Sequence, residues 1–205
     1  MNKKISESCL VVFAREPRQG QVKTRLNSRL SQEQCLLLYK DFLKDTIELV
    51  GNVRCDRKVI AYESNGENPS CLKKIAPDFE FYQQKGIDLG ERMKDVFHYF
   101  LNNSQKVVIM GSDSPGLPES NILRAFIELD EKDLVLGPTY DGGYYLIGLK
   151  KFCPEIFENV QWSTGSVFET TLLKAKELNK KCAVLDHWHD IDRPEDLKYL
   201  QGNNK

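Results

Sequence analysis

The sequence lacks a long apolar run near its start and an excess of charge of either sign. The first apolar run, residues 9–14, has six residues, too few for the core of a signal peptide and far too few to span a bilayer. Lysine plus arginine (29) nearly balances aspartate plus glutamate (30), so no global charge attracts nucleic acid or an anionic membrane. We therefore expect a cytoplasmic protein with neither partner, in which any anion binding is local.

The sequence also lacks a Cys-x-x-Cys pair, although it contains six cysteines. A chain of 205 residues with 40% hydrophobic side chains can bury a sizeable core without disulfides. Cys9, Cys35 and Cys182 fall inside apolar patterns, where cysteine usually behaves as a small core residue. We interpret the cysteines as reduced thiols and expect no catalytic thiol. No linker divides the chain, which predicts a single domain over residues 1–205.

Short apolar runs alternate with longer amphipathic stretches along the whole chain. The predicted strands are residues 9–14, 58–62, 79–83, 106–110, 134–137, 145–149 and 182–185. The predicted helices are residues 31–51, 89–100, 119–129 and 166–178, with a short one from residue 194. This order is typical of α/β proteins with a mostly parallel sheet flanked by helices.

A basic loop follows the first predicted strand, at the sheet edge where open parallel sheets bind ligands. It contains Arg15, Arg18, Lys23 and Arg25, and backbone amides near Gly20 can add donors. These groups can converge on a phosphate, although a solvated basic loop is the plainer alternative. The spacing is not that of a Walker loop, because Lys23 stands three residues after Gly20 instead of directly after it.

Two segments with carboxylates follow buried strands and suit Mg²⁺ or Mn²⁺. A Gly-Ser-Asp-Ser-Pro segment places Asp113 after the fourth strand, next to Ser112, which is small enough to let phosphate approach. After the last strand, residues 187–196 offer Asp192 or Asp190 as a second ligand. A turn role for Asp113 and a helix cap for Asp192 are the alternatives. A His-x-His zinc site is less favoured, because no third nitrogen or sulfur ligand is evident.

A tyrosine-rich loop joins the fifth and sixth strands. Its Asp141-Gly142 pair is a strong turn signal, and a simple hairpin explains much of it. Gly142, Gly143 and Tyr144 also suit a surface on which backbone packs closely against a ring or a sugar. Asp141 is then a candidate catalytic base or hydrogen-bond acceptor for the substrate.

A further loop precedes the second helix. Asp88 and Glu91 have the spacing of a helix cap, which is the favoured role for at least one of them. Asp88 and Arg92, together with Gly86 and Gly90, can still border the ligand. We therefore keep Asp88 and Arg92 as candidate substrate-binding residues.

Six segments occur in a fixed order: FAREPRQGQVKTRL, QKGIDLGERM, GSDSPGLP, LGPTYDGGYYLIGL, WST and DIDRPEDL. Together they resemble a bacterial family of GT-A-like candidate glycosyltransferases, described alongside radical-SAM proteins and arsenosugar formation. The resemblance spans nearly the whole chain. Several of the segments also resemble the nucleotidyltransferases that activate molybdopterin or phospholactate, which share the nucleotide-diphospho-sugar transferase fold.

The resemblance implies that Arg15, Lys23 and Arg25 hold the nucleotide phosphates and that Asp113 and Asp192 hold the metal. Two features depart from the pattern. Ala-Arg-Glu-Pro-Arg replaces the glycine-rich start expected of many sugar nucleotidyltransferases, so base recognition at this loop is undefined. Ser-Asp-Ser offers one carboxylate where Asp-x-Asp offers two, so the metal needs a further ligand from the C-terminal segment.

Three functions are compatible with these residues. The leading expectation is transfer of a glycosyl group from a nucleotide sugar to a small-molecule acceptor, with Asp141 and Lys23 as catalytic candidates and the metal stabilising the departing diphosphate. The alternative is nucleotidyl transfer, in which a phosphorylated acceptor attacks a nucleoside triphosphate and pyrophosphate leaves. The third is a non-catalytic nucleotide-binding module. The base, sugar, acceptor, stereochemical outcome and oligomeric state are not determined by the sequence.

Overall fold

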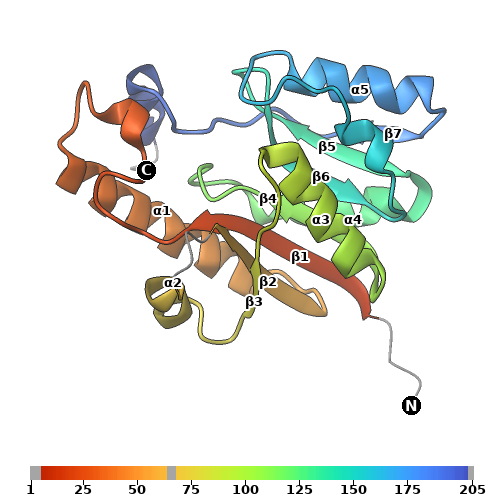
Figure 1. Cartoon of the computed structure of the whole chain (residues 1–205), viewed down its shortest axis with the longest axis horizontal. Helices are drawn as coiled ribbons and strands as arrows, with labels where there is room; N and C mark the ends of the chain where they lie inside the picture. The colour runs from red at the N-terminus through yellow and green to blue at the C-terminus, as the bar shows by residue number, and fades with distance from the viewer. Residues whose placement is uncertain (1–5, 64–67, 203–205) are drawn as a thin grey trace.

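The chain forms one sheet with helices on both faces (Figure 1). The computed structural model describes residues 6–63 and 68–202. The strands are β1 (Ser6–Arg15), β2 (Arg57–Glu63), β3 (Glu80–Gln83), β4 (Ser104–Met110), β5 (Leu134–Pro138), β6 (Tyr144–Leu149) and β7 (Cys182–Val184). The helices are α1 (Gln32–Asn52), α2 (Ser70–Ile75), α3 (Leu89–Leu101), α4 (Glu119–Glu131) and α5 (Val167–Glu177). Short 3₁₀ helices are η1 (Thr24–Leu26), η2 (Pro154–Phe157) and η3 (Pro194–Gly202).

The seven strands follow the order β3-β2-β1-β4-β6-β5-β7. β6 is antiparallel to both β4 and β5, and every other pair is parallel. The predicted α/β fold with a mostly parallel sheet is therefore confirmed, and the hairpin expected around the Asp-Gly turn is the β5–β6 connection. Because β1 and β4 are parallel neighbours, the loops that follow them lie at one edge of the sheet.

Each face of the sheet has its own hydrophobic cluster, because side chains alternate along a strand. In β1, Leu10, Val12 and Ala14 belong to the cluster under α1, α2 and α4. Cys9 and Val11 belong to the cluster under α3 and α5. Both faces are covered, which explains why the central strands appear in the sequence as continuous apolar runs.

The first helix shows how local signals position the site. Ser31 and Gln34 form the predicted capping box, with the Ser31 hydroxyl accepting from the Gln34 amide and the Gln34 side chain accepting from the Ser31 amide. The helix continues one residue past the predicted end at Gly51, to Asn52. Its buried stripe includes Tyr39, which places an aromatic hydroxyl under the loop after β1.

Several short elements differ from the sequence prediction, and two of them, η3 and α2, show why. The short helix from residue 194 is a 3₁₀ helix, and α2 was not predicted. The amides of Cys71 and Leu72 at the start of α2 donate to the carboxylate of Glu16, at 2.7 and 3.2 Å. The group that caps α2 is therefore 55 residues away in the sequence. For this reason, the residues next to α2 gave no signal that a helix begins there.

The segment after β7 crosses the carboxyl edge of the sheet from β5 to β4. The amides of Trp188 and Ile191 donate to the carbonyls of Pro138 and Asp113, at 3.0 and 2.9 Å. The segment thus carries the aspartates at positions 190 and 192 to the loop after β4. In the described part of the chain, no helix has the length and apolar character needed to cross a bilayer.

Candidate functional site

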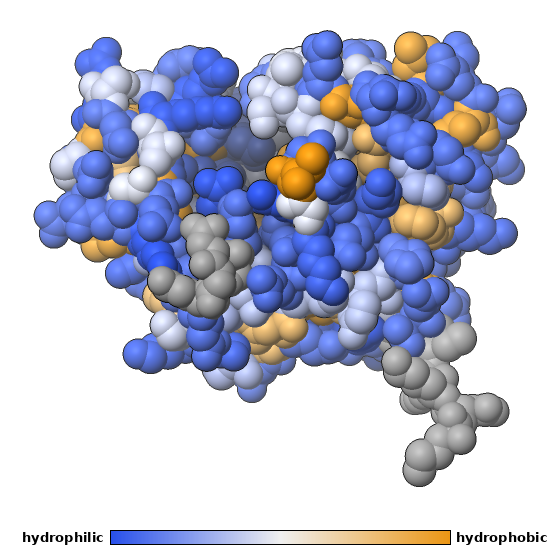
Figure 2. Space-filling view, viewed as in Figure 1, coloured by the Kyte–Doolittle hydropathy of each residue, from blue (hydrophilic) through white to orange (hydrophobic). Residues whose placement is uncertain are grey.

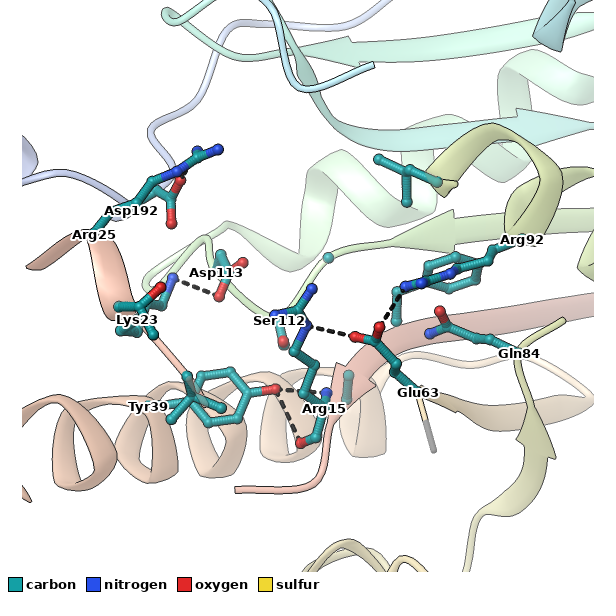
Figure 3. A pocket seen from close by; sticks show the side chains of 16 residues that line it. Arg15, Lys23, Arg25, Tyr39, Glu63, Gln84, Arg92, Ser112, Asp113 and Asp192 are labelled. Atoms are coloured by element: carbon teal, nitrogen blue, oxygen red, sulfur yellow. Dashed lines mark hydrogen bonds and ion pairs between the residues drawn. The ribbon is translucent and has the colours of Figure 1, made fainter. Parts of the chain in front are cut away.

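A cavity of about 450 Å³ opens at the carboxyl ends of β1 and β4. Figure 2 shows the molecule hollowed beside the start of α3, with hydrophilic side chains around the hollow. Seven of the predicted site residues line this cavity: Arg15, Lys23, Arg25, Arg92, Ser112, Asp113 and Asp192. These residues come from the N-terminal loop, the middle of the chain and the C-terminal segment, and they meet at one edge of the sheet (Figure 3).

Lys23 is the most constrained cation in the cavity wall. Its backbone is left-handed, with φ of 51°, and its side chain is only 3% exposed. Its ammonium group donates to the carbonyl oxygen of Ile191 at 2.6 Å and forms an ion pair with Asp113 Oδ1 at 2.5 Å. A buried charge is costly unless it is paired and hydrogen-bonded, so these two contacts fix the ammonium at this position.

Asp113 and Asp192 face the cavity from opposite segments. The Asp113 side chain is 43% exposed, although its Oδ1 atom is buried against Lys23. Asp192 Oδ2 pairs with Arg25 Nη1 at 2.5 Å. Its side chain is thus turned to the basic loop, while Asp196 accepts from the amides of Asp192 and Arg193 at the start of η3. Two ion pairs, Lys23 with Asp113 and Arg25 with Asp192, therefore line this wall.

Asp190 lies behind the wall and is not among the residues that line the cavity. The Ser114 hydroxyl donates to its Oδ1 atom. Burial raises the pKa of the Asp190 carboxyl from 3.8 to about 7; the Ser114 hydrogen bond opposes this rise, and the charges of Asp113 and Asp141 add to it. The Asp190 carboxyl therefore interacts electrostatically with Asp113. It is protonated, and thus neutral, over most of the pH range below about 7.

The described residues, 6–63 and 68–202, contain no group of three or more His, Cys, Asp or Glu side chains that could hold a metal ion unaided. Mg²⁺ is commonly held by one or two carboxylates together with substrate phosphates and water. The donors present, Asp113 and Asp192, fit such a shared arrangement. They do not fit a site built from protein ligands alone.

The β5–β6 loop is placed differently from the expectation. Asp141 Oδ1 accepts from the Thr139 hydroxyl at 2.5 Å and from the Gly143 amide at 3.2 Å, so the carboxylate closes its own turn. Gly142 has φ of 88°, and a Cβ at this position would overlap the carbonyl oxygen of Gly165. None of these residues lines the cavity. Gly142 thus packs closely against a neighbouring loop, and the expected contact of Gly142 and Gly143 with a ring or a sugar stays a prediction.

Tyr144 also lies away from the cavity. Its hydroxyl contacts the sulfur of Met93 at 3.8 Å, and its half-buried ring packs against the cluster under α3 and α5. Burial raises the pKa of the Tyr144 hydroxyl above its usual range. Tyr144 thus packs against the core in this structure, and its expected role in binding substrate stays a prediction.

Two other predicted residues have local roles. Asp88 caps α3 by accepting from the Glu91 amide at 2.8 Å, and Glu91 accepts from the Ile87 amide at 2.9 Å, which confirms the capping arrangement. Gly20 has φ of 74° and lies in an exposed turn outside the cavity lining. Neither contributes a side chain to the cavity.

Three lining residues were missed by sequence reasoning: Tyr39, Glu63 and Gln84. The Tyr39 hydroxyl accepts from the Arg15 amide at 2.7 Å and donates to the Arg15 carbonyl at 3.1 Å. Glu63 pairs with Arg15 Nε at 2.7 Å and with Arg92 Nη1 at 2.9 Å (Figure 3). Glu63 ends β2 and Gln84 follows β3, so the strand-end rule that identified Asp113 would have found both.

Comparison with known proteins places this chain in a family. A model of the family DUF2064, described as "Uncharacterized protein conserved in bacteria", matches residues 46–164. A crystal structure of a candidate nucleotide-diphospho-sugar transferase from Desulfovibrio desulfuricans G20 is 34% identical, covering 98% of this chain and 89% of that one, with a TM-score of 0.91. The predicted nucleotide-diphospho-sugar transferase fold is thereby confirmed.

More distant relatives share much of the chain. The 2-phospho-L-lactate guanylyltransferase of Methanocaldococcus jannaschii is 27% identical over 188 residues, which span 89% of this chain and 79% of that protein. The 4-diphosphocytidyl-2C-methyl-D-erythritol synthase of Anaerococcus prevotii is 14% identical, covers 95% and 96% of the two chains and has a TM-score of 0.62, which shows a common fold. On the family model and the Desulfovibrio structure, the chain belongs to the DUF2064 family and has the fold of the nucleotide-diphospho-sugar transferases.

Proposed function

We propose that this protein is a metal-dependent nucleotidyltransferase, which moves a nucleoside monophosphate from a nucleoside triphosphate to a phosphorylated small molecule and releases pyrophosphate. The observation that carries this proposal is the buried ammonium of Lys23, held at 2.5 Å from Asp113 in the cavity wall. A fixed cation beside an available carboxylate suits a polyphosphate chain neutralised by both a side chain and a metal. The similarity to a guanylyltransferase over most of the chain supports the same choice.

The reaction needs charge neutralisation more than proton transfer. An oxygen of the acceptor phosphate attacks the α-phosphorus, the bond from that phosphorus to the bridging β-oxygen breaks, and pyrophosphate departs with its electron pair. Lys23, Arg25 and Arg15 supply positive charge where the leaving group develops negative charge. A phosphate at neutral pH already offers an ionised oxygen, so this reaction requires no catalytic base. The closed turn around Asp141 is compatible with that requirement.

Asp113 and Asp192 would hold the divalent cation, with Asp190 behind them. Mg²⁺ or Mn²⁺ would supply Lewis-acid charge to the phosphate oxygens of the substrate. The remaining work belongs to the chain itself: Tyr39 fixes the backbone of Arg15, and Lys23 holds the Ile191 segment against the loop after β4. The site is thus organised around the triphosphate before the acceptor arrives.

Glycosyl transfer, the leading expectation from the sequence, is the second candidate. It is favoured by the high structural similarity to the Desulfovibrio protein. Transfer to a hydroxyl group requires that the hydroxyl lose its proton, and Asp141 is then the candidate base. The comparisons with nucleotidyltransferases favour the first reaction, because a guanylyltransferase is matched along most of this chain.

Slow hydrolysis of the donor separates the candidates without knowledge of the acceptor. The purified protein is incubated with Mg²⁺ or Mn²⁺ and either the four nucleoside triphosphates or a panel of nucleotide sugars. Without an acceptor, we expect nucleoside monophosphate and pyrophosphate from one triphosphate. With 2-phospho-L-lactate or another phosphorylated hydroxy acid, pyrophosphate should appear faster and the nucleoside monophosphate should be found joined to the acceptor. A nucleoside diphosphate released from a nucleotide sugar would instead establish glycosyl transfer. Binding without turnover of either donor would identify a non-catalytic module.

A further inference from the structure

The two ends of the cavity differ in chemistry. One end, next to Asp113 and Asp192, carries Lys23 and Arg25. The other end, at the tips of β2 and β3, is lined by Glu63, Gln84, Leu89 and Arg92, with Phe13 nearby on β1. The charged end suits phosphates and a metal. The second end combines acceptor oxygens with apolar surface, which suits a flat heterocycle with polar edges.

The Glu63 carboxylate remains able to accept further hydrogen bonds at this second end. Each of its oxygens forms an ion pair with one arginine, Oε2 with Arg15 and Oε1 with Arg92. An ionised carboxylate has about four lone-pair positions, so roughly two stay available. The side chain is 28% exposed, and it is held from both sides (Figure 3). The two ion pairs therefore hold the Glu63 carboxylate in place and leave part of its hydrogen-bonding capacity available to a ligand.

Gln84 and Arg92 extend this polar edge. The amide nitrogen of Gln84 donates to the Ala61 carbonyl at 2.7 Å, which leaves its amide oxygen directed to the cavity, beneath Arg92 (Figure 3). Arg92 uses Nη1 for Glu63 and Nε for the Gly86 carbonyl at 3.3 Å, so further N–H groups of its five remain. Two fixed acceptor groups thus stand beside one fixed donor group.

We infer that this end of the cavity binds the base of a guanine nucleotide, with Glu63 accepting from the 2-amino group, Gln84 accepting from N1–H and Arg92 donating to O6. Guanine is the base whose Watson–Crick edge places two neighbouring donors beside an acceptor. Adenine and cytosine each offer one amino donor there, and uracil offers one N–H between two carbonyl oxygens. The exposed side chain of Leu89 supplies an apolar surface for the ring. This inference rests on the proposed function, because it names the triphosphate that the same site would use.

Calorimetric binding of GTP, ITP, ATP and tripolyphosphate tests the assignment in the presence of Mg²⁺. ITP lacks the 2-amino group, and tripolyphosphate lacks the base. We expect wild-type protein to bind GTP roughly tenfold or more tightly than ITP, as for loss of one hydrogen bond to a charged group. Equal affinities for GTP, ITP and ATP would overturn the inference, as would absence of nucleotide binding.

Two variants separate base recognition from support of the arginines. Glu63→Gln should reduce the preference for GTP over ITP to near unity while tripolyphosphate affinity is retained. Gln84→Met should weaken GTP binding while leaving the pairs of Glu63 with Arg15 and Arg92 in place. Glu33→Gln, which changes the same charge on the exposed surface of α1, should bind GTP as the wild type does. A loss of equal size for all four ligands in Glu63→Gln would show that Glu63 only positions the arginines, and would overturn the inference.

Pyrophosphate release, measured on the same samples, keeps this inference distinct from the proposed function. Selective GTP binding without pyrophosphate release would retain the base site and reject nucleotidyl transfer. Pyrophosphate release from GTP, ITP and ATP with equal affinities would retain the reaction and reject the base site.

Discussion

The loop after β4 and the loop between β5 and β6 both present an aspartate among small residues, yet the structure uses the two carboxylates differently. Asp141 satisfies its own turn through Thr139 and Gly143. Asp113 has only the Lys23 ammonium against its buried oxygen, and its side chain opens to the cavity. A carboxylate at a strand end is available to a ligand when its loop supplies few donors. The sequence motif alone does not distinguish the two cases.

The largest expected effect concerns Asp113. Asp113→Asn should lower metal-dependent turnover about 100-fold or more, because metal coordination contributes several kcal/mol to stabilising the leaving group. Turnover is measured as pyrophosphate release over a Mg²⁺ titration, and circular dichroism checks the fold. Asp141→Asn is the matched control and should keep most of its turnover. Equal losses of turnover in the two variants would contradict the different roles that we assign to Asp113 and Asp141.

Lys23→Ala should weaken binding of the nucleoside triphosphate by about 1.5–3 kcal/mol, the usual contribution of a hydrogen bond to a charged group. Calorimetry measures the affinity. Arg29→Ala, at an exposed position beyond η1, is the control and should bind normally. An unchanged affinity in Lys23→Ala would mean that the ammonium serves only to hold Ile191 and Asp113 together.

The raised pKa of Asp190 predicts a pH dependence of stability. Between about pH 4 and pH 7 the folded chain keeps a proton that the unfolded chain has released, so the free energy of unfolding falls as pH rises through this window. Asp190→Asn should therefore be more stable than the wild type at pH 8, by at least about 1.4 kcal/mol, the equivalent of one pKa unit. At pH 4 the two should differ little.

Urea unfolding at both pH values, with a chelator present, measures this difference. Asp186→Asn is the control, because Asp186 is an exposed aspartate in the same segment. A stability gain of equal size at pH 4 and pH 8 would show that the buried carboxyl does not titrate as its surroundings predict.

The smallest effect is expected at Asp141. Asp141→Ala removes the acceptor for Thr139 and Gly143 and should cost about 1 kcal/mol of unfolding free energy, whereas Asp141→Asn keeps an acceptor oxygen and should cost less. Thermal unfolding measures both. A severe loss of turnover in Asp141→Asn without loss of stability would favour a catalytic base, and with it glycosyl transfer.

Sequence patterns were sufficient for the framework of the fold. Continuous apolar runs located each strand of the sheet, and the strand-end rule brought Lys23, Arg25 and Asp113 to one edge. They were insufficient where a distant group completes a local structure, as when Glu16 caps α2. They also do not determine which way a ring beside a loop points: Tyr144 was proposed to bind substrate, and its half-buried ring packs against core side chains. Glu63 stands at a strand end, but it belongs to none of the motifs from which the site was predicted.

The contact between Lys23 and Ile191 joins residues separated by 168 positions. Closing so long a loop costs chain entropy that local contacts do not repay, so such contacts usually form late in folding. The strands β1, β2, β3 and β4 can associate before the segment after β7 arrives, but the cavity wall cannot. Ligand competence should consequently appear as the last step of folding, after most of the secondary structure, and a nascent chain that has not yet released residue 191 from the ribosome would have no complete phosphate site.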